Sequence, residues 1–173
     1  MKDLTWLKTS YIAHRGLHKK DQSVVENTKT AFEKAVQSNY AIECDLQLLK
    51  DDEIVVFHDS NLNRLAHLPK KLSDLTLDEV KAVKLLHTED RILTLSELLD
   101  FVQGRVPLLI EIKPGKNLKN LCARFVQIIE SYSGDFAVFS FHPKVVYWFK
   151  KNAPEIIRGQ IAEAFKDQKM NNI

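Results

Sequence analysis

The alternation of apolar and polar residues is most regular in the segment 41–59, where it predicts two adjacent strands. Between Ile42 and Leu48 the even positions are apolar and the odd positions are polar, so the two faces of the first strand differ in character. A second β-rich run follows after about half a dozen residues, too few for a parallel crossover, so we expect a hairpin. A turn near Asp51 would bring His58 opposite Glu43.

Helix starts are marked by Thr-x-x-Glu spacings, which are capping-box signatures. They occur at Thr30 with Glu33, at Thr76 with Glu79, and at Thr94 with Glu97. Other elements are predicted as strands at 11–13, 106–112, 136–141 and 156–161, and as helices at 118–132 and from Pro143.

The order of these elements indicates an α/β fold with a mainly parallel sheet. We expect a single domain over residues 1–173, with a small excursion at about 60–93 whose first part, residues 60–76, is an irregular polar surface segment. Chemically active side chains fall at or near the predicted strand C-termini, where α/β folds place their sites. They are His14, Arg15, Glu43, Asp45, His58, Glu111 and Lys113.

Composition narrows the function classes. The chain is 45% hydrophobic and 28% charged with a net charge of +2, and its Lys and Arg are scattered, so nucleic-acid binding is not expected. No apolar run approaches roughly 18 residues, which argues against stable membrane insertion, and the N-terminus lacks a signal-peptide pattern. Cys44 and Cys122 lie in apolar patterns without metal-ligand spacing. We expect both to be reduced and buried, in a cytoplasmic protein.

Three carboxylates come from separate stretches of the predicted sheet, at Glu43, Asp45 and Glu111. If all three pointed into the same opening at the end of the sheet, the carboxylates would repel one another. A divalent cation bound between them would offset this repulsion. Ligation by oxygen alone selects Mg²⁺, Ca²⁺ or Mn²⁺ over zinc. Arg15 and Lys113 add two positive charges, which suits the site to a singly charged phosphodiester. His14 and His58 then offer one base and one acid.

Each of these motifs also has a purely structural interpretation. The acidic pair on the first hairpin strand could be a solvated face, and a buried Glu111 could simply pair with Lys113 or Arg15. The remaining structural alternatives are a strand-ending turn at 14–16, polarity at a helix start at 26–28, and loop polarity at 58–59.

Taken together and in order, the motifs resemble the glycerophosphodiester phosphodiesterase family of metal-dependent (β/α)8 barrels. The matching pieces are His14-Arg15-Gly16, Glu26-Asn27-Thr28, Glu43-Cys44-Asp45, the run 55–59, the run 72–76, the run 109–113 and Ser140-Phe141. They cover nearly the whole chain, and their combination is far more specific than any one of them.

The resemblance implies roles for nine residues. These are the metal ligands Glu43, Asp45 and Glu111, the paired acid and base His14 and His58, the phosphate-contacting Arg15 and Lys113, and the substrate-site support Glu26 and Asn27. The implied reaction is hydrolysis of a small glycerophosphodiester, such as glycerophosphocholine, to glycerol 3-phosphate and an alcohol. One divalent cation is implied, Mg²⁺ or Ca²⁺ with Mn²⁺ as a third option. Direct water attack and a cyclic phosphate route both stay open.

Two departures from the family pattern matter. Val25 stands where the family usually has proline, and a barrel of this type typically needs about 250 residues. We therefore expect a TIM-type barrel that is incomplete at the C-terminus by about two strand-helix units, with a homo-oligomer as one way to cover the open edge. The alternatives to full activity are a weak or inactive member that acts as a binding module, and a related phospholipase or lyase.

Overall fold

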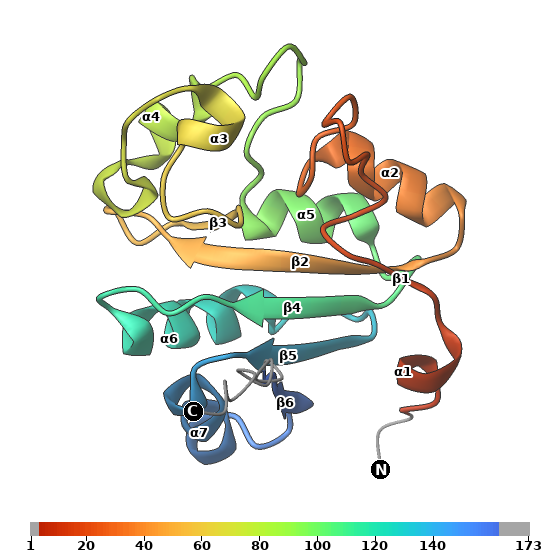
Figure 1. Cartoon of the computed structure of the whole chain (residues 1–173). Helices are drawn as coiled ribbons and strands as arrows, with labels where there is room; N and C mark the ends of the chain where they lie inside the picture. The colour runs from red at the N-terminus through yellow and green to blue at the C-terminus, as the bar shows by residue number, and fades with distance from the viewer. Residues whose placement is uncertain (1–3, 163–173) are drawn as a thin grey trace, which may run out of the picture.

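The computed structural model describes residues 4–162, which form one six-stranded sheet with helices packed along it (Figure 1). The strands are β1 (Ile12–Ala13), β2 (Ala41–Leu48), β3 (Ile54–Val56), β4 (Leu108–Ile112), β5 (Phe136–Ser140) and β6 (Arg158–Gln160). The helices are α1 (Trp6–Thr9), α2 (Lys29–Gln37), α3 (Asn63–Ala66), the 3₁₀ turn η1 (Leu72–Asp74), α4 (Leu77–Lys81), α5 (Leu95–Val102), α6 (Leu118–Ile129) and α7 (Pro143–Asn152). The strand order is β1-β2-β4-β5-β6, and neighbouring strands in this order are parallel, which confirms the predicted mainly parallel sheet.

The predicted hairpin is confirmed. Strand β3 pairs antiparallel with β2, and Gln47 faces Val55 in the register that a turn near Asp51 requires. The ladder ends at Val56, so His58 is not paired across the hairpin with Glu43 as the sequence predicted. Beyond the ladder, the described backbone after β3 makes one more hydrogen bond to β2, from Phe57 N–H to the carbonyl oxygen of Asp45. The chain then turns away from β2.

The two faces of the sheet carry different residues. On β2, Ile42, Cys44 and Leu46 are fully buried in the main core, which also contains buried residues of α2, α5, α6 and α7. Side chains alternate along a strand, so the residues between them point to the opposite face. The carboxylates of β2 and β4 occupy this second face, away from the covering helices.

Helix starts follow the predicted signals in two cases out of three. Full capping boxes form at Thr76 for α4 and at Thr94 for α5. The predicted box at Thr30 is wrong, because α2 begins at Lys29 and its N-cap is Thr28, whose hydroxyl accepts from the N–H of Ala31. The hydroxyl of Thr30 instead donates to Asp90, 2.9 Å away.

The segment 60–76 is more ordered than the irregular polar loop that the sequence predicted. It contains α3 and η1, and all its leucines except the exposed Leu68 are buried in a second apolar core with Val25 and Phe57. Those leucines are Leu62, Leu65, Leu72 and Leu75. This second core fixes the excursion against the end of the hairpin, and α3 lies beside that end of the sheet (Figure 1).

Within the described residues the sheet is open, with β1 and β6 at its edges. Among residues 4–162 five strands run parallel, against the eight of a closed barrel. The prediction of an α/β barrel fold, incomplete in this chain, is confirmed. No helix within residues 4–162 has the length and apolarity needed to cross a bilayer.

Candidate functional site

Three acidic side chains meet on the face of the sheet away from the helices. Glu43 and Asp45 share this face of β2, and Asp45 lies beside Glu111 in the register of β2 and β4. One carboxylate oxygen from each of the three lies within 4.8 Å of the other two, and all three side chains are buried. The structure therefore brings the predicted metal ligands together and excludes a solvated strand face for Glu43 and Asp45.

The three acids shift one another's protonation. Burial, followed by the repulsion of Asp45, raises the pKa of Glu43 to about 8. Burial also raises the pKa of Glu111 above its ordinary value, against the opposing effect of Lys113. A raised carboxyl pKa means that too little positive charge surrounds the ionised group. A divalent cation would supply that charge and hold the carboxylates in their ionised form.

Two cations already lie against the acidic cluster. The Nζ of Lys113 is 3.3 Å from Asp45 Oδ1 and 3.1 Å from Glu111 Oε1, so the predicted pairing of Glu111 with Lys113 does form. The Nε of Arg15 is 3.4 Å from Asp45 Oδ2. Against three carboxylates these two positive charges leave the cluster one charge short of neutrality when all are ionised.

The loop after β1 holds Arg15 in a left-handed conformation, with φ of 56°. In this conformation its backbone N–H donates to Glu43 Oε2 at 2.8 Å. Gly16 follows with φ of 76°, and a Cβ there would lie 2.9 Å from the backbone of Ala31. The loop can therefore pack against the start of α2 only with glycine at this position.

Glu26 and Asn27 are buried behind the cluster, and both are engaged with its residues. The amide of Asn27 donates to Asp45 Oδ2 at 2.8 Å. Glu26 accepts from Arg15 Nη1, also at 2.8 Å. These contacts fit a supporting polar element, because the two side chains hold one predicted ligand and one predicted phosphate-binding group in place.

The two histidines occupy different surroundings. His14 is 67% exposed, and its Nε2 lies 3.9 Å from Glu43 Oε2. Partial burial, followed by the adjacent Arg15, lowers the pKa of His14. His58 is half-buried and its Nδ1 lies 2.8 Å from Asp59 Oδ1. The three backbone carbonyls from Phe57 to Asp59 accept from the amide of Gln47, which fixes the loop that carries His58.

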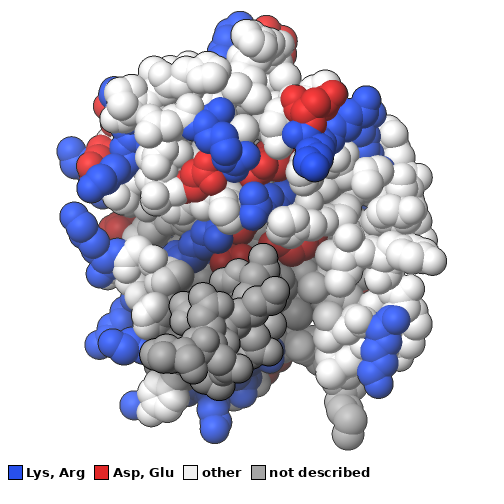
Figure 2. Space-filling view, in the orientation of Figure 1, with Lys and Arg blue, Asp and Glu red and all other residues white. Residues whose placement is uncertain are grey.

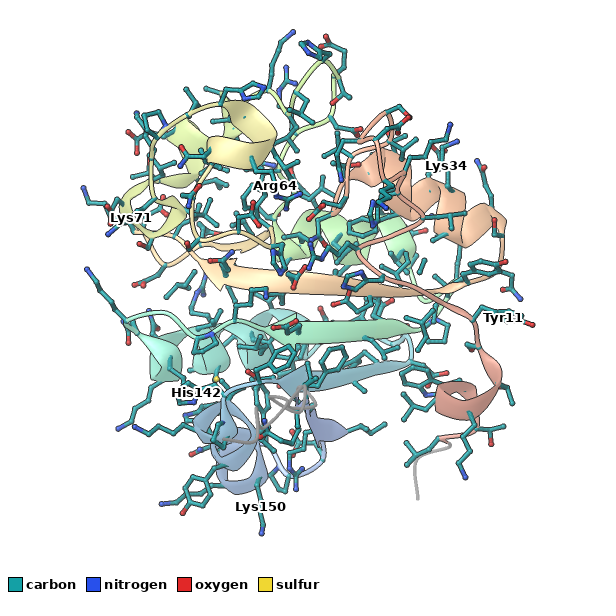
Figure 3. All side chains as sticks on the ribbon, viewed as in Figure 1. Tyr11, Lys34, Arg64, Lys71, His142 and Lys150 are labelled. Atoms are coloured by element: carbon teal, nitrogen blue, oxygen red, sulfur yellow. The ribbon has the colours of Figure 1, made fainter. Side chains whose placement is uncertain are left out.

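Arg64 is the residue of this site that the sequence analysis missed. Its guanidinium donates to both oxygens of Glu26, at 2.8 and 2.7 Å, and to both oxygens of Asp59, at 2.7 and 3.0 Å. Its side chain extends from α3 toward the sheet (Figure 3), and it completes a chain of ion pairs from Arg15 to His58. In the sequence it is one arginine in a polar segment, and its only local signal is its distance of five residues from Asp59.

This network lowers the pKa values of its acids. For Glu26 burial acts to raise the pKa, but hydrogen bonds from Arg64 and Arg15 outweigh it and bring the value to about 2. For Asp59 burial is likewise outweighed by hydrogen bonds from Arg64 and His58, and its pKa lies below the ordinary value. Both acids are therefore anionic at neutral pH and hold their cationic partners firmly.

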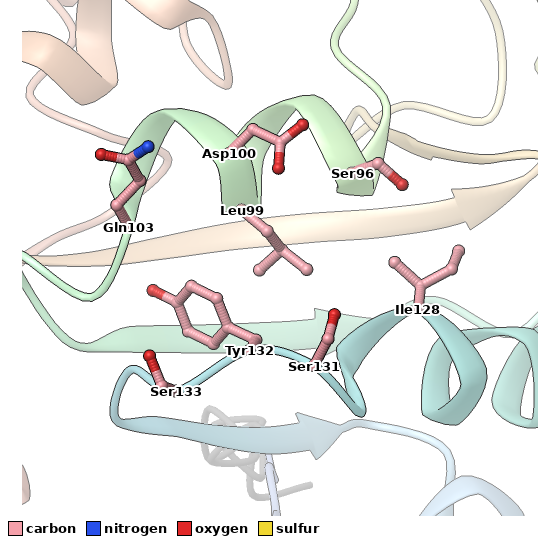
Figure 4. Close-up of a pocket in the computed structure, with 8 residues that line it drawn as sticks. All are labelled: Ser96, Leu99, Asp100, Gln103, Ile128, Ser131, Tyr132 and Ser133. Atoms are coloured by element: carbon pink, nitrogen blue, oxygen red, sulfur yellow. The ribbon is translucent and has the colours of Figure 1, made fainter.

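A hollow of about 330 Å³ lies elsewhere, between α5 and the end of α6 (Figure 4). Ser96 and Asp100 of α5 face Ser131 and Tyr132 across it. Its lining contains none of the nine predicted site residues. The acidic cluster on the sheet therefore remains the best candidate for the functional site.

The chain is similar to known proteins over most of its length. Residues 14–171 match the model of the glycerophosphoryl diester phosphodiesterase family. A glycerophosphodiester phosphodiesterase from Caldanaerobacter subterraneus subsp. tengcongensis is 33% identical over 161 residues, which are 87% of this chain and 65% of that protein. A lysophospholipase D from Rattus norvegicus is 30% identical over 135 residues, which are 70% of this chain and 41% of that protein. The chain therefore spans less than two thirds of the length of these relatives.

Solved structures give the same result. A phosphodiesterase from Oleispira antarctica, in complex with the product sn-glycerol-3-phosphate, superposes with a TM-score of 0.82 at 25% identity, covering 92% of this chain and 68% of that one. A glycerophosphodiester phosphodiesterase from Thermotoga maritima gives a TM-score of 0.73 at 28% identity, covering 90% of this chain and 62% of that one.

Proposed function

The chain belongs to the glycerophosphoryl diester phosphodiesterase family, and from that premise we propose that it hydrolyses glycerophosphodiesters to glycerol 3-phosphate and an alcohol. The observation that carries this proposal is the convergence of Glu43, Asp45 and Glu111, buried and within 4.8 Å of one another. The product named for the Oleispira antarctica structure, sn-glycerol-3-phosphate, supports the same substrate class.

The three carboxylates fit one divalent cation. Ligand oxygens around a Ca²⁺ ion lie about 2.3–2.6 Å from it, so two of them on opposite sides are about 5 Å apart, close to the spread seen here. All donors are oxygen, which favours Mg²⁺ or Ca²⁺, with Mn²⁺ as a third option. Glu43, Asp45 and Glu111 would hold the cation, which when bound polarises a phosphoryl oxygen.

Arg15 and Lys113 are proposed to bind the phosphate. Both side chains are partly exposed beside the acidic cluster, and a planar guanidinium suits two non-bridging oxygens at once. Glu26 and Asn27 support the substrate site from behind: Glu26 orients Arg15, and Asn27 orients Asp45. A correctly placed phosphodiester needs both supports, because small displacements of reacting groups are costly in rate.

His14 and His58 are proposed to move the protons of the reaction. The carboxylate of Asp59 accepts a hydrogen bond from Nδ1 of His58, so Nδ1 carries a proton. The other ring nitrogen, Nε2, is then free to accept or donate a proton in the reaction. The Nε2 of His14 lies on the edge of the acidic cluster and is open to solvent. One ring can therefore accept the proton of the attacking hydroxyl, from water or from the substrate's glycerol, while the other protonates the leaving oxygen.

A second substrate class follows from one of the relatives. The likeness to a lysophospholipase D supports cleavage of the same phosphodiester when it is carried on a lysophospholipid. The buried free thiols of Cys44 and Cys122 fit a reducing compartment, so the cytoplasm is the proposed location.

The direct test is release of glycerol 3-phosphate from glycerophosphocholine by the purified chain. A chelator is expected to abolish release, and added Mg²⁺ or Ca²⁺ to restore it. Turnover that is insensitive to chelation would contradict the metal role. Metal binding without turnover above that of a His14→Ala variant would instead support a binding module.

A further inference from the structure

A groove of about 820 Å³ runs between the start of α6 and the length of α7, apart from the acidic cluster. One wall is the stretch 116–119. The other is a stripe of α7 at helical spacing, formed by Lys144, Tyr147, Trp148 and Lys151. The opposite side of α7 anchors the helix, because Val145 and Phe149 are fully buried in the main core.

Four lysines line this groove: Lys116, Lys119, Lys144 and Lys151. All four are exposed, and none pairs with an acidic side chain among residues 4–162. The segment 113–152 holds seven Lys and Arg but only two acidic residues, in a chain whose net charge is +2. Figure 2 shows the basic side chains gathered over this side of the molecule, at the left and lower edge of the view. Positive charge is therefore concentrated here.

Aromatic side chains lie between the lysines. Tyr147 is 66% exposed, although an aromatic ring of this size is normally more buried, and Trp148 is partly exposed beside it. Tyr and Trp have an apolar ring and a polar tip, which suits them to the head-group level of a bilayer. The groove thus combines the two side-chain types found at lipid interfaces.

The groove also lies at the side of the sheet where the candidate site opens. Lys116 belongs to the loop that leaves the C-terminal end of β4, three residues after Lys113. Lys144 follows the C-terminal end of β5 in the same way, and β4 and β5 are parallel neighbours. A surface that rests on this groove would therefore lie beside the mouth that Lys113 lines.

We propose that the groove between α6 and α7 docks the protein on an anionic membrane surface, so that a glycerophosphodiester head group carried on a lipid reaches the acidic cluster. Delivery of a lipid head group to the acidic cluster rests on the proposed function, whereas docking on the membrane does not. A bilayer presents many phosphates and a negative surface potential to a set of exposed lysines. A small free anion is a poorer fit, because none of the four lysines is buried and the groove offers no enclosed donors.

Sedimentation with lipid vesicles tests the docking. The chain is expected to bind vesicles of phosphatidylcholine with 30% phosphatidylglycerol and to stay in solution with phosphatidylcholine alone. Lys116→Glu with Lys144→Glu should lower the bound fraction by about tenfold or more, and Tyr147→Ala should lower it at unchanged charge. The matched control is Lys34→Glu with Lys71→Glu, two exposed lysines that do not line the groove (Figure 3), which should bind like the parent.

A fluorescence measurement places the contact independently. The chain has two tryptophans, so Trp6→Phe leaves Trp148 in the groove as the single reporter. Its emission is expected to shift to the blue with anionic vesicles and to stay unchanged with inorganic phosphate. The proposal is overturned by absence of binding to anionic vesicles, by equal losses in groove and control variants, or by binding without a change at Trp148.

Comparing a water-soluble substrate with a membrane-bound one tests this inference separately from the proposed function. Groove variants should turn over water-soluble glycerophosphocholine at the parental rate but lose turnover of a lysophospholipid held in anionic vesicles. Equal loss on both substrates would overturn the docking role. Failure of the parent on both substrates would count against the proposed function, while vesicle binding would still decide the docking.

Discussion

Arg64 holds Glu26 through two parallel hydrogen bonds, with Nη1 2.8 Å from Oε2 and Nη2 2.7 Å from Oε1. The same guanidinium bonds both oxygens of Asp59, which in turn holds His58. One side chain from the excursion therefore links the carboxylate behind Arg15 to the carboxylate behind His58. The relative position of a predicted phosphate-binding group and a predicted proton-transfer group depends on it.

Replacing Arg64 with alanine is expected to lower kcat/KM for glycerophosphocholine by about 10–100-fold, because Arg15 and His58 lose their common support. Lysine should restore little, since an ammonium cannot bond two carboxylates in the planar, bidentate way that a guanidinium does. Steady-state kinetics of Arg64→Ala and Arg64→Lys check this. Lys71→Ala, an exposed change in the same excursion, is the control. A parental kcat/KM in Arg64→Ala would show that the network does not position the site.

The low pKa of Glu26, about 2 against an ordinary 4.5, predicts a specific pH dependence of stability. A carboxyl whose pKa falls on folding stabilises the folded state above pH 4.5, and the contribution is lost as pH falls towards 2. At neutral pH it is worth on the order of 3 kcal/mol. The free energy of unfolding of Glu26→Gln should therefore lie below that of the parent at pH 7, and the gap should narrow between pH 4.5 and 2. A gap that stays constant across this range would contradict the assignment.

Glu111→Gln is expected to weaken binding of Mg²⁺ or Ca²⁺ by at least about 100-fold, because it removes one of three carboxylates from the cluster. The metal-free protein should not lose stability, since the change also removes a repulsive charge. Titration calorimetry and thermal unfolding measure the two effects. Glu130→Gln, an exposed acid after α6, is the matched control. Unchanged affinity in Glu111→Gln would exclude this residue as a ligand.

Alanine at His14 or at His58 should reduce kcat by about 10²–10⁴-fold, the range typical of positioned acids and bases. Because His14 is largely exposed, its replacement should leave the melting temperature nearly unchanged. His87→Ala removes an exposed histidine away from the cluster and should retain full activity. If either site variant keeps a parental kcat, that histidine does not transfer a rate-limiting proton.

Gly16→Ala is expected to destabilise the protein by about 1–3 kcal/mol and to impair the site, because its φ is +76° and a Cβ would lie 2.9 Å from Ala31. Gly115→Ala offers a control, since a Cβ there meets nothing within 4 Å. Chemical denaturation of both variants checks the difference. Equal stabilities would mean that the loop after β1 relaxes without strain.

Much of the fold is visible in the sequence, because strand periodicity is a local property. The alternation that starts at Ile42 predicts both the hairpin and the shared face of Glu43 and Asp45. The position of Glu111 beside Asp45 can also be predicted from the sequence, because adjacent parallel strands align their C-terminal ends. Roles in catalysis and metal binding remain predictions from the family resemblance and await the experiments above.

Contacts between distant segments decided the rest. Thr30 has the spacing of an N-cap, but Asp90, sixty residues away, takes its hydroxyl, and Thr28 caps α2 instead. Arg64 reaches Glu26 only because buried leucines fix α3 against the end of the hairpin. The sequence by itself therefore determined which side chains alternate on each strand and which chemistry they offer. Only tertiary packing, which depends on the shapes of surfaces far apart in the chain, decided which charged groups meet.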